Sequence, residues 1–434
     1  MTRRNKHAGS ILMLSIHGYV DGEPELGKPD TGGQVVFVLE LAKRFARLGY
    51  HVDLVTRRFE GQRRVDRVIE GLRVLRIPFG GSGFIRKEDM HDHLGDFVTS
   101  FLHTVKSRQL DYDVVSSHYW DAGWAGQKIA EELNIPHIHT PHSIGAWKRQ
   151  QMSGTAEKME ATYRFEERIR KEFLVYRSCD HIVATTREQT ELLKKHYDLN
   201  DRNITVIPPG IDENRFVPLP RDRVKSARER FGMSEKTIYA VGRMARNKGY
   251  DLLIRSFGAT RQIVPDAKLL LAVGAGEDDQ DERKVAELRK VASEVGVADD
   301  VIYAGYVPDE DMADRYRAAG VFALSSRYEP FGMTAIEAMA CGTPTVVTVH
   351  GGLHEIISFG RNCLYSDPLH PEEFGAVLAL PLRYPRLAED LSIEGSRFAR
   401  RSFGWTGIAK RTLEVFDRFK GKYATTAGEA RKGF

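Results

Sequence analysis

Cysteine is scarce in this chain, and its three cysteines, Cys179, Cys341 and Cys363, are too widely spaced to form a CxxC pair. An odd number of isolated cysteines argues against a disulfide framework or a structural zinc site and favours a reducing compartment. Long apolar runs are also missing, since no stretch approaches the roughly 18 residues that a membrane span needs. The apolar ILMLSI behind the basic N-terminus is too short for a secretory signal. We therefore expect a cytoplasmic protein without a membrane partner.

A strong charge imbalance is absent too. The 434 residues carry a net charge of +4, which is small for so large a surface and predicts no nucleic-acid partner. A GxGxxG dinucleotide fingerprint is likewise missing. The composition, with 41% hydrophobic and 29% charged residues, is that of an ordinary globular protein. The length exceeds one compact core and suits two α/β domains.

Strand-like and helix-like segments alternate along both halves of the chain. This alternation predicts two doubly wound, Rossmann-like domains, each with a parallel sheet covered by helices on both faces and with a cleft between the domains. Four prolines within residues 208–220 mark a stiff connector. We therefore expect an N-terminal domain over residues 1–210, a C-terminal domain over 211–404, a last helix over 405–420 and a flexible tail over 421–434. Long helices are predicted over 87–106 and 156–177.

Residues 320–355 form the most informative unit. An apolar strand over 321–324 leads into a polar loop, and the loop leads into a helix over 334–340, with Thr334 as its expected cap and Gly342 closing it. Loops at the carboxyl ends of parallel strands bind ligands, and a helix N-terminus suits a phosphate. Glu329 lies in the loop, and Glu337 lies in the helix, where it either faces solvent or is held by a partner.

Two further turns follow strands in the first half. Asp30, Thr31, Gly32, Gly33 and Gln34 form a sequence that fits either close contact with a ligand or a simple strand-to-helix turn. The second turn contains His139, His142, Ser143 and Lys148. It brings no carboxylate to its two histidines, so it predicts a ligand-contacting turn with His142 and Lys148 exposed, and no metal.

Basic residues recur near these turns. Lys87, Lys148, Arg168 and Arg170 are candidates for one anion site, although solvated surface and an i,i+4 surface pair of Arg168 with Glu172 are the simpler interpretations. In the second half, Arg243 and Lys248 flank a turn that follows a strand. Two cations in such a place suit a diphosphate, and a solvated turn is the alternative.

Together these motifs resemble a known family. Glu329 and Glu337 match the E-x7-E motif of retaining GT-B glycosyltransferases of family 4, and the GGQ loop, the THPHS turn, the PPGID connector and the G-R-x4-K-G turn occur in that family's order. The resemblance covers about residues 10 to 420. HGYVDGEPELGKPDTGGQ, RKED and PHSIGAWK are similar to the sucrose-phosphate synthase branch. TRRFEGQ, SHYWDAG and GRMARNKGYD are more similar to mannosylfructose-phosphate synthases.

The resemblance implies a role for each matching residue. The N-terminal domain would bind a sugar phosphate through a set of acceptor residues: Gly33, Gln34, Lys87, Tyr119, Ser143, Lys148, Arg168 and Arg170. The C-terminal domain would bind a nucleoside diphosphate sugar. Its donor residues would be Arg243, Lys248, Tyr306, Val307, Glu329, Phe331, Gly332, Met333, Thr334 and Glu337, with Gly33 reaching the transferred sugar. His142, Arg243, Lys248 and Glu329 would be the catalytic residues, and the last helix would return to the N-terminal domain.

The function that the resemblance implies is retaining transfer of mannose from GDP-mannose to fructose 6-phosphate. One alternative is sucrose-phosphate synthesis from UDP-glucose or ADP-glucose, and another is a non-catalytic sugar-nucleotide-binding protein. We expect no required cofactor, with Mg²⁺ at most stimulating, because Arg243 and Lys248 would replace a metal at the diphosphate. The family also implies a functional pairing with a sugar-phosphate phosphatase.

Overall fold

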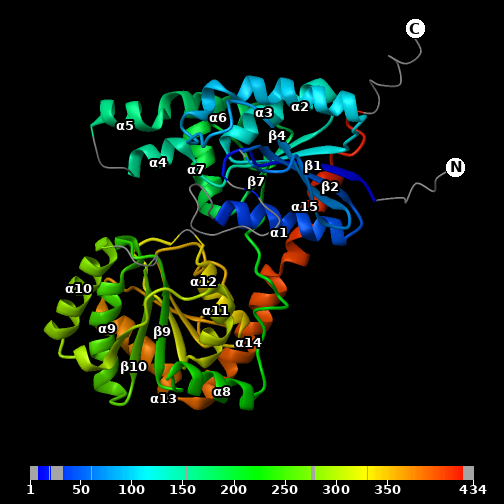
Figure 1. The fold of residues 1–434 in the computed structure, drawn as a ribbon. Helices are drawn as coiled ribbons and strands as arrows, with labels where there is room; N and C mark the ends of the chain where they lie inside the picture. The colour runs from blue at the N-terminus through cyan, green and yellow to red at the C-terminus, as the bar shows by residue number, and fades with distance from the viewer. Residues whose placement is uncertain are drawn as a thin grey trace, which may run out of the picture. The chain divides into compact units, whose positions relative to one another are not determined.

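The computed structural model describes residues 8–18, 20, 33–59, 61–151, 155–274, 279–329 and 331–423. The chain forms two compact units, shown in Figure 1. Unit 1 comprises Met1–Pro209 together with Trp405–Phe434, and unit 2 comprises Gly210–Gly404. Each unit is built on its own twisted sheet.

The sheet of unit 1 has the strand order β3-β4-β2-β1-β5-β6-β7-β8. The strands are β1 (Ser10–Leu14), β2 (His51–Arg57), β3 (Val65–Ile69), β4 (Leu72–Ile77), β5 (Val114–His118), β6 (His137–Thr140), β7 (His181–Ala184) and β8 (Ile204–Val206). All neighbours pair in parallel except β3 and β4, which are antiparallel. The expectation of a wholly parallel sheet is therefore wrong at this edge. Only Glu70 and Gly71 join β3 to β4. A two-residue turn can connect antiparallel strands, whereas parallel strands need a long crossover connection.

The helices of unit 1 cover both faces of this sheet, as Figure 1 shows. They are α1 (Gly33–Arg47), α2 (Leu94–Arg108), α3 (Trp120–Leu133), α4 (Gly145–Gln151), α5 (Ala156–Tyr163), α6 (Phe165–Ser178), α7 (Arg187–Tyr197) and α15 (Trp405–Asp417), with short turns at η1 (Met90–Asp92) and η2 (Asp201–Asn203). Strand β1 explains the layering. Ile11 and Met13 pack with α1 and α15, whereas Leu12 and Leu14 pack with α2 and α3. This alternation follows from the two-residue period of a strand.

Two predicted helices of unit 1 are divided or shortened in the structure. The expected helix over 156–177 is interrupted at Arg164, whose φ of 48° is left-handed, so that α5 ends and α6 begins on either side of it. The expected helix over 87–106 starts later, because η1 precedes α2. Residues next to both interruptions line the cavity described below.

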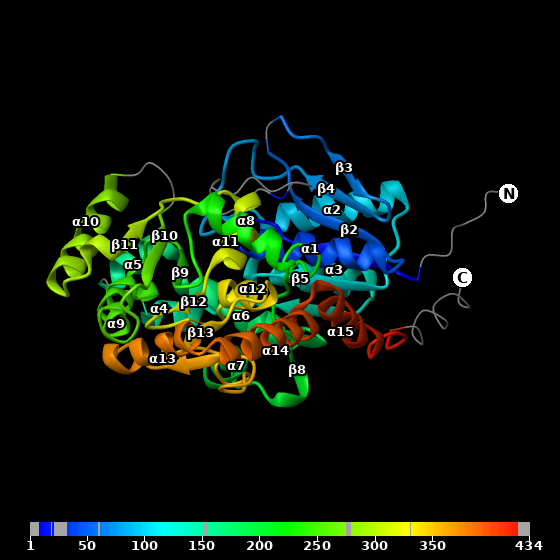
Figure 2. The ribbon, with the colours of Figure 1, turned by 90° about the horizontal axis from the view of Figure 1, so that it is seen from below.

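The last helix, α15, is part of unit 1. Its Trp405 ring lies 5.2 Å from the ring of Phe37, and its Phe416 ring lies 5.6 Å from that of Phe45. Figure 2 shows α15 beside α1, with which it shares a core. From residue 424 onward, the predicted tail lies outside the described residues.

The sheet of unit 2 has the order β11-β10-β9-β12-β13-β14, and all its neighbours pair in parallel. Its strands are β9 (Thr237–Gly242), β10 (Lys268–Val273), β11 (Val301–Tyr303), β12 (Val321–Leu324), β13 (Thr345–Thr348) and β14 (Leu364–Ser366). Its helices are α8 (Arg221–Phe231), α9 (Tyr250–Ile263), α10 (Asp279–Glu294), α11 (Asp309–Ala318), α12 (Met333–Ala340), α13 (Pro371–Arg383) and α14 (Pro385–Phe403), with η3 (Arg246–Lys248) and η4 (Ala298–Asp300) between them.

Unit 2 has a core on each face of its sheet. Along β12, Val321 and Ala323 pack with α9, α10 and α13, whereas Phe322 and Leu324 pack with α11 and α12. Figure 2 shows α9 beside α13 and α12 beside α14, in agreement with their contacts. The sequence interpretation missed α8, because the helix is strongly basic and buries only Ala227. In neither unit does the described part of the chain include a helix with the length and hydropathy that crossing a membrane requires.

Candidate active site

The donor-site residues predicted in unit 2 gather where β9 and β12 end. The turn that contains η3 follows β9, and the loop that leads to α12 follows β12. Lys248 from the turn donates to Glu329 from the loop, with 2.6 Å between Nζ and Oε2. Ser326 Oγ donates to the same carboxylate oxygen at 3.2 Å. The structure therefore brings together two of the four residues predicted to be catalytic.

The backbone of the turn and the loop is locked by close packing. Gly249 has a left-handed φ of 66°, and a Cβ there would lie 2.2 Å from the carbonyl oxygen of Ser325. Ser325 Oγ in turn donates to the carbonyl oxygens of Lys248 and Gly249, at 3.2 and 3.1 Å. Only glycine fits this conformation and this contact. The position of the Lys248 ammonium is thus set by the backbone on both sides.

Glu329 is fixed from its other side by the segment after β13. Its N–H donates to the carbonyl oxygen of His350 at 2.9 Å, and Glu329 forms an isolated parallel bridge with Gly351. A Cβ at Gly351 would lie 2.2 Å from the Glu329 carbonyl oxygen, so this approach also requires glycine. The loop therefore presents the Glu329 carboxylate from a rigid frame.

Helix α12 begins one residue earlier than predicted. Gly332, with a left-handed φ of 85°, is its N-cap, so the prediction of a Thr334 cap is wrong. A left-handed φ suits glycine better than threonine at the sharp turn into the helix. Met333 and Thr334 therefore form the first turn, and both are half-buried. N–H groups in a first turn have no acceptor within the helix, which makes this end suitable for an anion.

Glu337 does not simply face solvent. Its side chain is half-buried on α12 and accepts a hydrogen bond from the Tyr316 hydroxyl at 2.9 Å. Burial raises the pKa of Glu337 to about 7, although the tyrosine opposes this effect. The carboxyl group is therefore held by a partner, which is one of the two interpretations that the sequence left open.

The other predicted donor residues differ in exposure. Arg243 directly follows β9 and is exposed, as is Tyr306 at 59%. Val307 and Phe331 are buried in the core beside α12. The side chains of Val307 and Phe331 therefore pack in the core under the site. The side chains of Arg243 and Tyr306 are instead exposed at the surface of unit 2.

In unit 1, three predicted acceptor cations reach one small cavity. Lys87, Lys148 and Arg168 come from the segment before η1, from α4 and from α6 respectively. They line a cavity of about 10 Å³ together with Glu88, His91, Trp120, Tyr163, Phe165. This volume holds about one water molecule. A larger anion would have to displace the flexible lysine side chains.

Arg168 is the fixed member of this cluster. It is 4% exposed and donates through Nε to Glu172 at 2.8 Å, so the alternative interpretation of an Arg168–Glu172 pair is right about the partner and wrong about its place at the surface. The same carboxylate of Glu172 also accepts from the Gly145 N–H, at 3.0 Å for the nearer oxygen. The Arg168–Glu172 pair therefore ties α6 to the start of α4, which carries Lys148.

Two further donor atoms of Arg168 reach other predicted acceptor residues. Nη1 donates to the Tyr119 hydroxyl at 3.0 Å, and Nη2 donates to the carbonyl oxygen of Ser143 at 3.2 Å. Tyr119 has a φ of 79°, an unusual value for a non-glycine residue that indicates local strain. Arg170 is exposed on α6 and is absent from the described residues that line the cavity.

His142 and Gln34, also in unit 1, both contact His118. His142 is half-buried rather than exposed as predicted, because its ring packs edge-on against Phe37 at 4.9 Å. Its Nε2 lies 3.0 Å from Nδ1 of the buried His118. Burial lowers the pKa of His142 well below its ordinary value, and the nearby histidines add to this effect. Gln34 Nε2 donates to the carbonyl oxygen of His118 at 3.3 Å.

Gly33 begins α1, whereas Asp30, Thr31 and Gly32 lie outside the described residues. Sequence reasoning missed several supporting residues that only the fold reveals. His118 contacts His142, Tyr316 contacts Glu337, and Ser326 contacts Glu329. His118 ends a buried strand one residue before Tyr119, and this position is the one local signal that could have identified it.

Known proteins match this chain along both units. A family model described as Glycosyltransferase Family 4 matches residues 31–215, and one described as Glycosyl transferases group 1 matches residues 222–397. Mannosylfructose-phosphate synthase of Agrobacterium fabrum is 49% identical over 412 residues, which cover 94% of this chain and 91% of that protein. D-inositol 3-phosphate glycosyltransferase of Xylanimonas cellulosilytica is 34% identical, covering 94% and 96% of the two chains.

A solved structure agrees with these matches. Sucrose-phosphate synthase of Thermosynechococcus elongatus aligns with a TM-score of 0.75 and 27% identity over 94% of this chain and 98% of that chain. Anabaena HepE in complex with UDP shares the fold, with a TM-score of 0.70 and 18% identity over 94% of this chain and 100% of that chain.

Proposed function

The chain belongs to the GT-B glycosyltransferases of family 4, and we propose that it transfers mannose from GDP-mannose to fructose 6-phosphate with retention of anomeric configuration. The product would be a phosphorylated mannosyl-fructose disaccharide. The support for this choice of substrates is the 49% identity to a mannosylfructose-phosphate synthase, together with the arrangement of charge in unit 1.

The observation that carries the proposal is that Lys87, Lys148 and Arg168 line one cavity. Lys87 pairs with Glu88 at 3.5 Å and Arg168 pairs with Glu172 at 2.8 Å. With Lys148 as a third cation, positive charge exceeds negative charge around the cavity, which favours an anion there. A phosphate monoester carries nearly two negative charges at neutral pH and accepts several hydrogen bonds. Tyr119 and Ser143 contact Arg168 and would complete the set around the phosphate. Gly33 and Gln34 would approach the sugar hydroxyls of the acceptor.

In unit 2 we assign the diphosphate to Arg243 and Lys248. The N–H groups of Met333 and Thr334 in the first turn of α12 would add two further donors. Glu329 would hold hydroxyls of the transferred sugar while its contact with Lys248 keeps both side chains in place. Glu337 would accept from the ribose, with Tyr306, Val307, Phe331 and Gly332 shaping the nucleotide site.

The reaction that this assignment supports is a front-face displacement. The glycosidic bond to the diphosphate breaks as the acceptor hydroxyl approaches from the same face. The departing phosphate oxygen accepts the proton of that hydroxyl, so no side chain is needed as a general base. Because the attack comes from the face on which the diphosphate departs, the configuration is retained without a covalent nucleophile. Arg243 and Lys248 stabilise the charge that develops on the diphosphate, which is the task for which fixed cations are most effective. We place His142 beside the transferred sugar, where its neutral ring would donate or accept a hydrogen bond.

We propose that the reaction requires no metal. The two cations of unit 2 already balance the charge that a divalent ion balances elsewhere. Mg²⁺ is then at most a stimulating ion. Exhaustive chelation should leave turnover intact, and loss of turnover that Mg²⁺ restores would contradict this part of the proposal.

A second candidate function is sucrose-phosphate synthesis from UDP-glucose or ADP-glucose, which the likeness to the Thermosynechococcus enzyme favours. Mannose and glucose differ only in the orientation of the 2-hydroxyl group. A panel of GDP-mannose, UDP-glucose and ADP-glucose, each with fructose 6-phosphate, separates the candidates by released nucleotide. The proposal predicts the highest kcat/KM for GDP-mannose. A higher value for UDP-glucose would replace it with the second candidate.

The product of either reaction keeps the phosphate ester of its acceptor. A phosphatase that acts on sugar phosphates is therefore the class of enzyme that we propose would consume it. Coupling a phosphatase that hydrolyses the phosphorylated disaccharide and not fructose 6-phosphate should release inorganic phosphate only after transfer has occurred.

A further inference from the structure

One residue that lines the cavity of Lys87, Lys148 and Arg168 has a buried ring nitrogen without a hydrogen-bond partner in the described part of the chain. His91, on η1, is 7% exposed and lines the cavity together with Lys87, Lys148 and Arg168. Among the described residues, its Nε2 atom has no hydrogen-bond partner although it is buried. A buried polar atom without a partner costs free energy, so such atoms are few and call for an explanation.

The other ring nitrogen of His91 shows which tautomer is present. Lys171 Nζ lies 3.0 Å from His91 Nδ1, 3.2 Å from the His91 carbonyl oxygen and 2.9 Å from Glu167 Oε1. An ammonium group has three donors and no acceptor, and these three contacts use all of them. Nδ1 therefore accepts, and the ring proton of a neutral His91 resides on Nε2.

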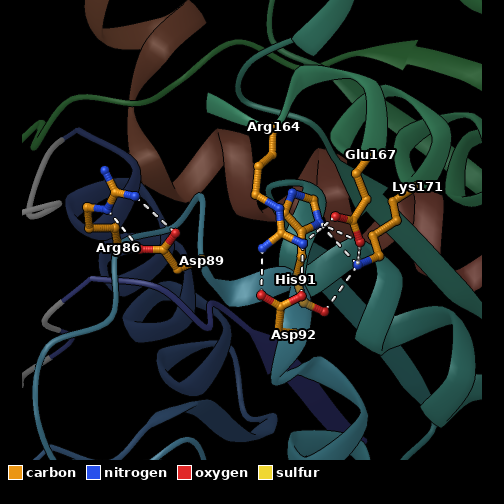
Figure 3. Close-up of polar contacts among 7 residues, drawn as sticks. All are labelled: Arg86, Asp89, His91, Asp92, Arg164, Glu167 and Lys171. Atoms are coloured by element: carbon orange, nitrogen blue, oxygen red, sulfur yellow. Dashed lines mark hydrogen bonds and ion pairs between the residues drawn. The ribbon is translucent and has the colours of Figure 1, made fainter. Parts of the chain in front are cut away.

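The contacts around Lys171 hold this arrangement in place, as Figure 3 shows. Glu167 accepts from Lys171 and also from Arg164 Nη2 at 2.6 Å. Arg164 binds both carboxylate oxygens of Asp92, at 2.6 and 2.8 Å, and Asp92 is the neighbour of His91 on η1. The series of contacts therefore begins at His91 and ends at Asp92, both on η1, and it joins η1 to the α5–α6 junction.

Packing fixes the plane of the ring. The His91 ring stacks on the Trp120 ring with 4.0 Å between centroids and 22° between planes. Burial lowers the pKa of His91 to about 4, and the Lys171 charge contributes to the shift while Glu167 opposes it. The ring is therefore neutral at physiological pH, with one N–H available at Nε2.

We propose that His91 is an acceptor-specificity residue, which donates its Nε2–H to the phosphate group of the bound sugar phosphate. Lys171 is then the positioning residue that sets the tautomer. This inference rests on the proposed function, since it assumes a phosphate monoester in the cavity of Lys87, Lys148 and Arg168. The lysine ammonium groups attract a phosphate without fixing its orientation, because an ammonium acts as a point charge. The N–H of a fixed, neutral His91 ring would orient the phosphate by a directional hydrogen bond.

The test compares two substitutions at one position. His91→Phe keeps an aromatic ring against Trp120 and removes both ring nitrogens, whereas His91→Gln keeps a donor. We expect His91→Phe to raise the KM for fructose 6-phosphate by about tenfold to a hundredfold, as loss of a hydrogen bond to a charged group does. The donor KM and kcat should change by less than about threefold, and His91→Gln should restore most of the acceptor affinity.

Lys171→Met tests the positioning role, because it keeps the length of the side chain without the ammonium. Nδ1 is then free to carry the proton, so the acceptor KM should rise while the donor KM stays unchanged. Arg86→Ala is the matched control on the same segment, since Arg86 pairs with Asp89 at the surface, where both side chains are about half exposed. Its acceptor KM should equal that of the wild type.

Three results would overturn the inference. They are an acceptor KM for His91→Phe within twofold of wild type, equal rises in the KM of donor and acceptor, and no recovery with His91→Gln. Thermal melting of each variant separates these outcomes from failure to fold.

The proposed function and this inference fail differently. If the wild type releases no nucleotide from GDP-mannose, UDP-glucose or ADP-glucose with fructose 6-phosphate, both candidate functions are wrong. Thermal stabilisation by inorganic phosphate then tests His91 alone, since a bound ligand raises the melting temperature. Wild type stabilised more than His91→Phe would keep the inference, and equal stabilisation, or none in either protein, would end it.

Discussion

Lys248 and Glu329, eighty-one positions apart in the sequence, meet through a 2.6 Å contact between Nζ and Oε2. Their side chains are 22% and 13% exposed, so this ion pair is neither a solvated surface pair nor a fully buried one. Each is assigned to a different part of the donor, Lys248 to the diphosphate and Glu329 to the sugar. The contact means that each residue positions the other, and that the bond to be broken would lie beside both of them.

Removal of the Lys248 ammonium is expected to damage turnover more than binding. Lys248→Ala should lower kcat by about a hundredfold or more, because a donor to the developing charge is lost. Lys290→Ala, an exposed lysine on α10, is the control and should match the wild type. Steady-state kinetics with varied donor measures both. Full turnover in Lys248→Ala would remove Lys248 from the leaving-group site.

Loss of Lys148 is expected to act on the acceptor alone. Lys148→Ala should raise the KM for fructose 6-phosphate by about tenfold or more, since a charge-assisted contact to phosphate is lost, and leave the donor KM unchanged. Lys128→Ala on α3 is the matched control, because Lys128 is 44% exposed and pairs with Glu131. An unchanged acceptor KM in Lys148→Ala would show that the cavity of unit 1 does not hold the phosphate.

Glu337 should make the protein less stable as pH rises. Its pKa is about 7 in the folded protein, above its ordinary value of 4.5, so between these values the folded state binds more protons than the unfolded state. The stability that protonated Glu337 contributes is fully present below pH 4.5 and is lost as pH rises through 7. Allowing for its partial exposure, we expect a loss of about 2 kcal/mol.

Glu337→Gln supplies the comparison, because glutamine has nearly the same shape and no titration. Urea unfolding at pH 5 and pH 8 should show that the wild type loses more stability than the variant between the two pH values. Equal losses would mean that the pKa of Glu337 is not raised.

Gly249 should be irreplaceable for two reasons, its left-handed φ and its close approach to the Ser325 carbonyl oxygen. A comparison with Gly296 separates these two effects. Gly249→Ala meets both a left-handed φ and the Ser325 carbonyl oxygen, whereas Gly296→Ala meets a similar φ of 73° with nothing within 4 Å. We expect Gly296→Ala to cost about 1 kcal/mol of unfolding free energy, and Gly249→Ala to cost more than about 2 kcal/mol. Chemical denaturation measures both. Equal costs would show that the loop moves away freely from the turn.

The sequence predicted the two-sheet architecture because buried parallel strands leave continuous apolar runs, as at Val321 to Leu324. It did not predict β3, whose residues are half-buried or exposed at a sheet edge and therefore show no such run. The E-x7-E spacing located Glu329 and Glu337, since both lie on one local unit. Their partners Lys248 and Tyr316 come from other segments, and no local pattern reports a contact of that kind.

Contacts between distant segments also explain what the sequence could not predict of the acceptor site. Lys87, Lys148 and Arg168 were candidates by residue type. Their common cavity is also lined by residues beside the break at Arg164 and before the late start of α2, and neither feature was predicted. His91 was not predicted, because a histidine in a polar stretch resembles solvated surface until its packing on Trp120 and its contact with Lys171 are seen.

The central claim is retaining transfer of mannose to a sugar phosphate, and nuclear magnetic resonance of one reaction mixture tests it most directly. GDP-mannose and fructose 6-phosphate are incubated with the protein, and the anomeric signal of the product is followed. The account predicts equal amounts of GDP and a phosphorylated disaccharide whose mannosyl linkage is α, as in the donor. A β linkage, or free mannose in place of a disaccharide, would contradict it.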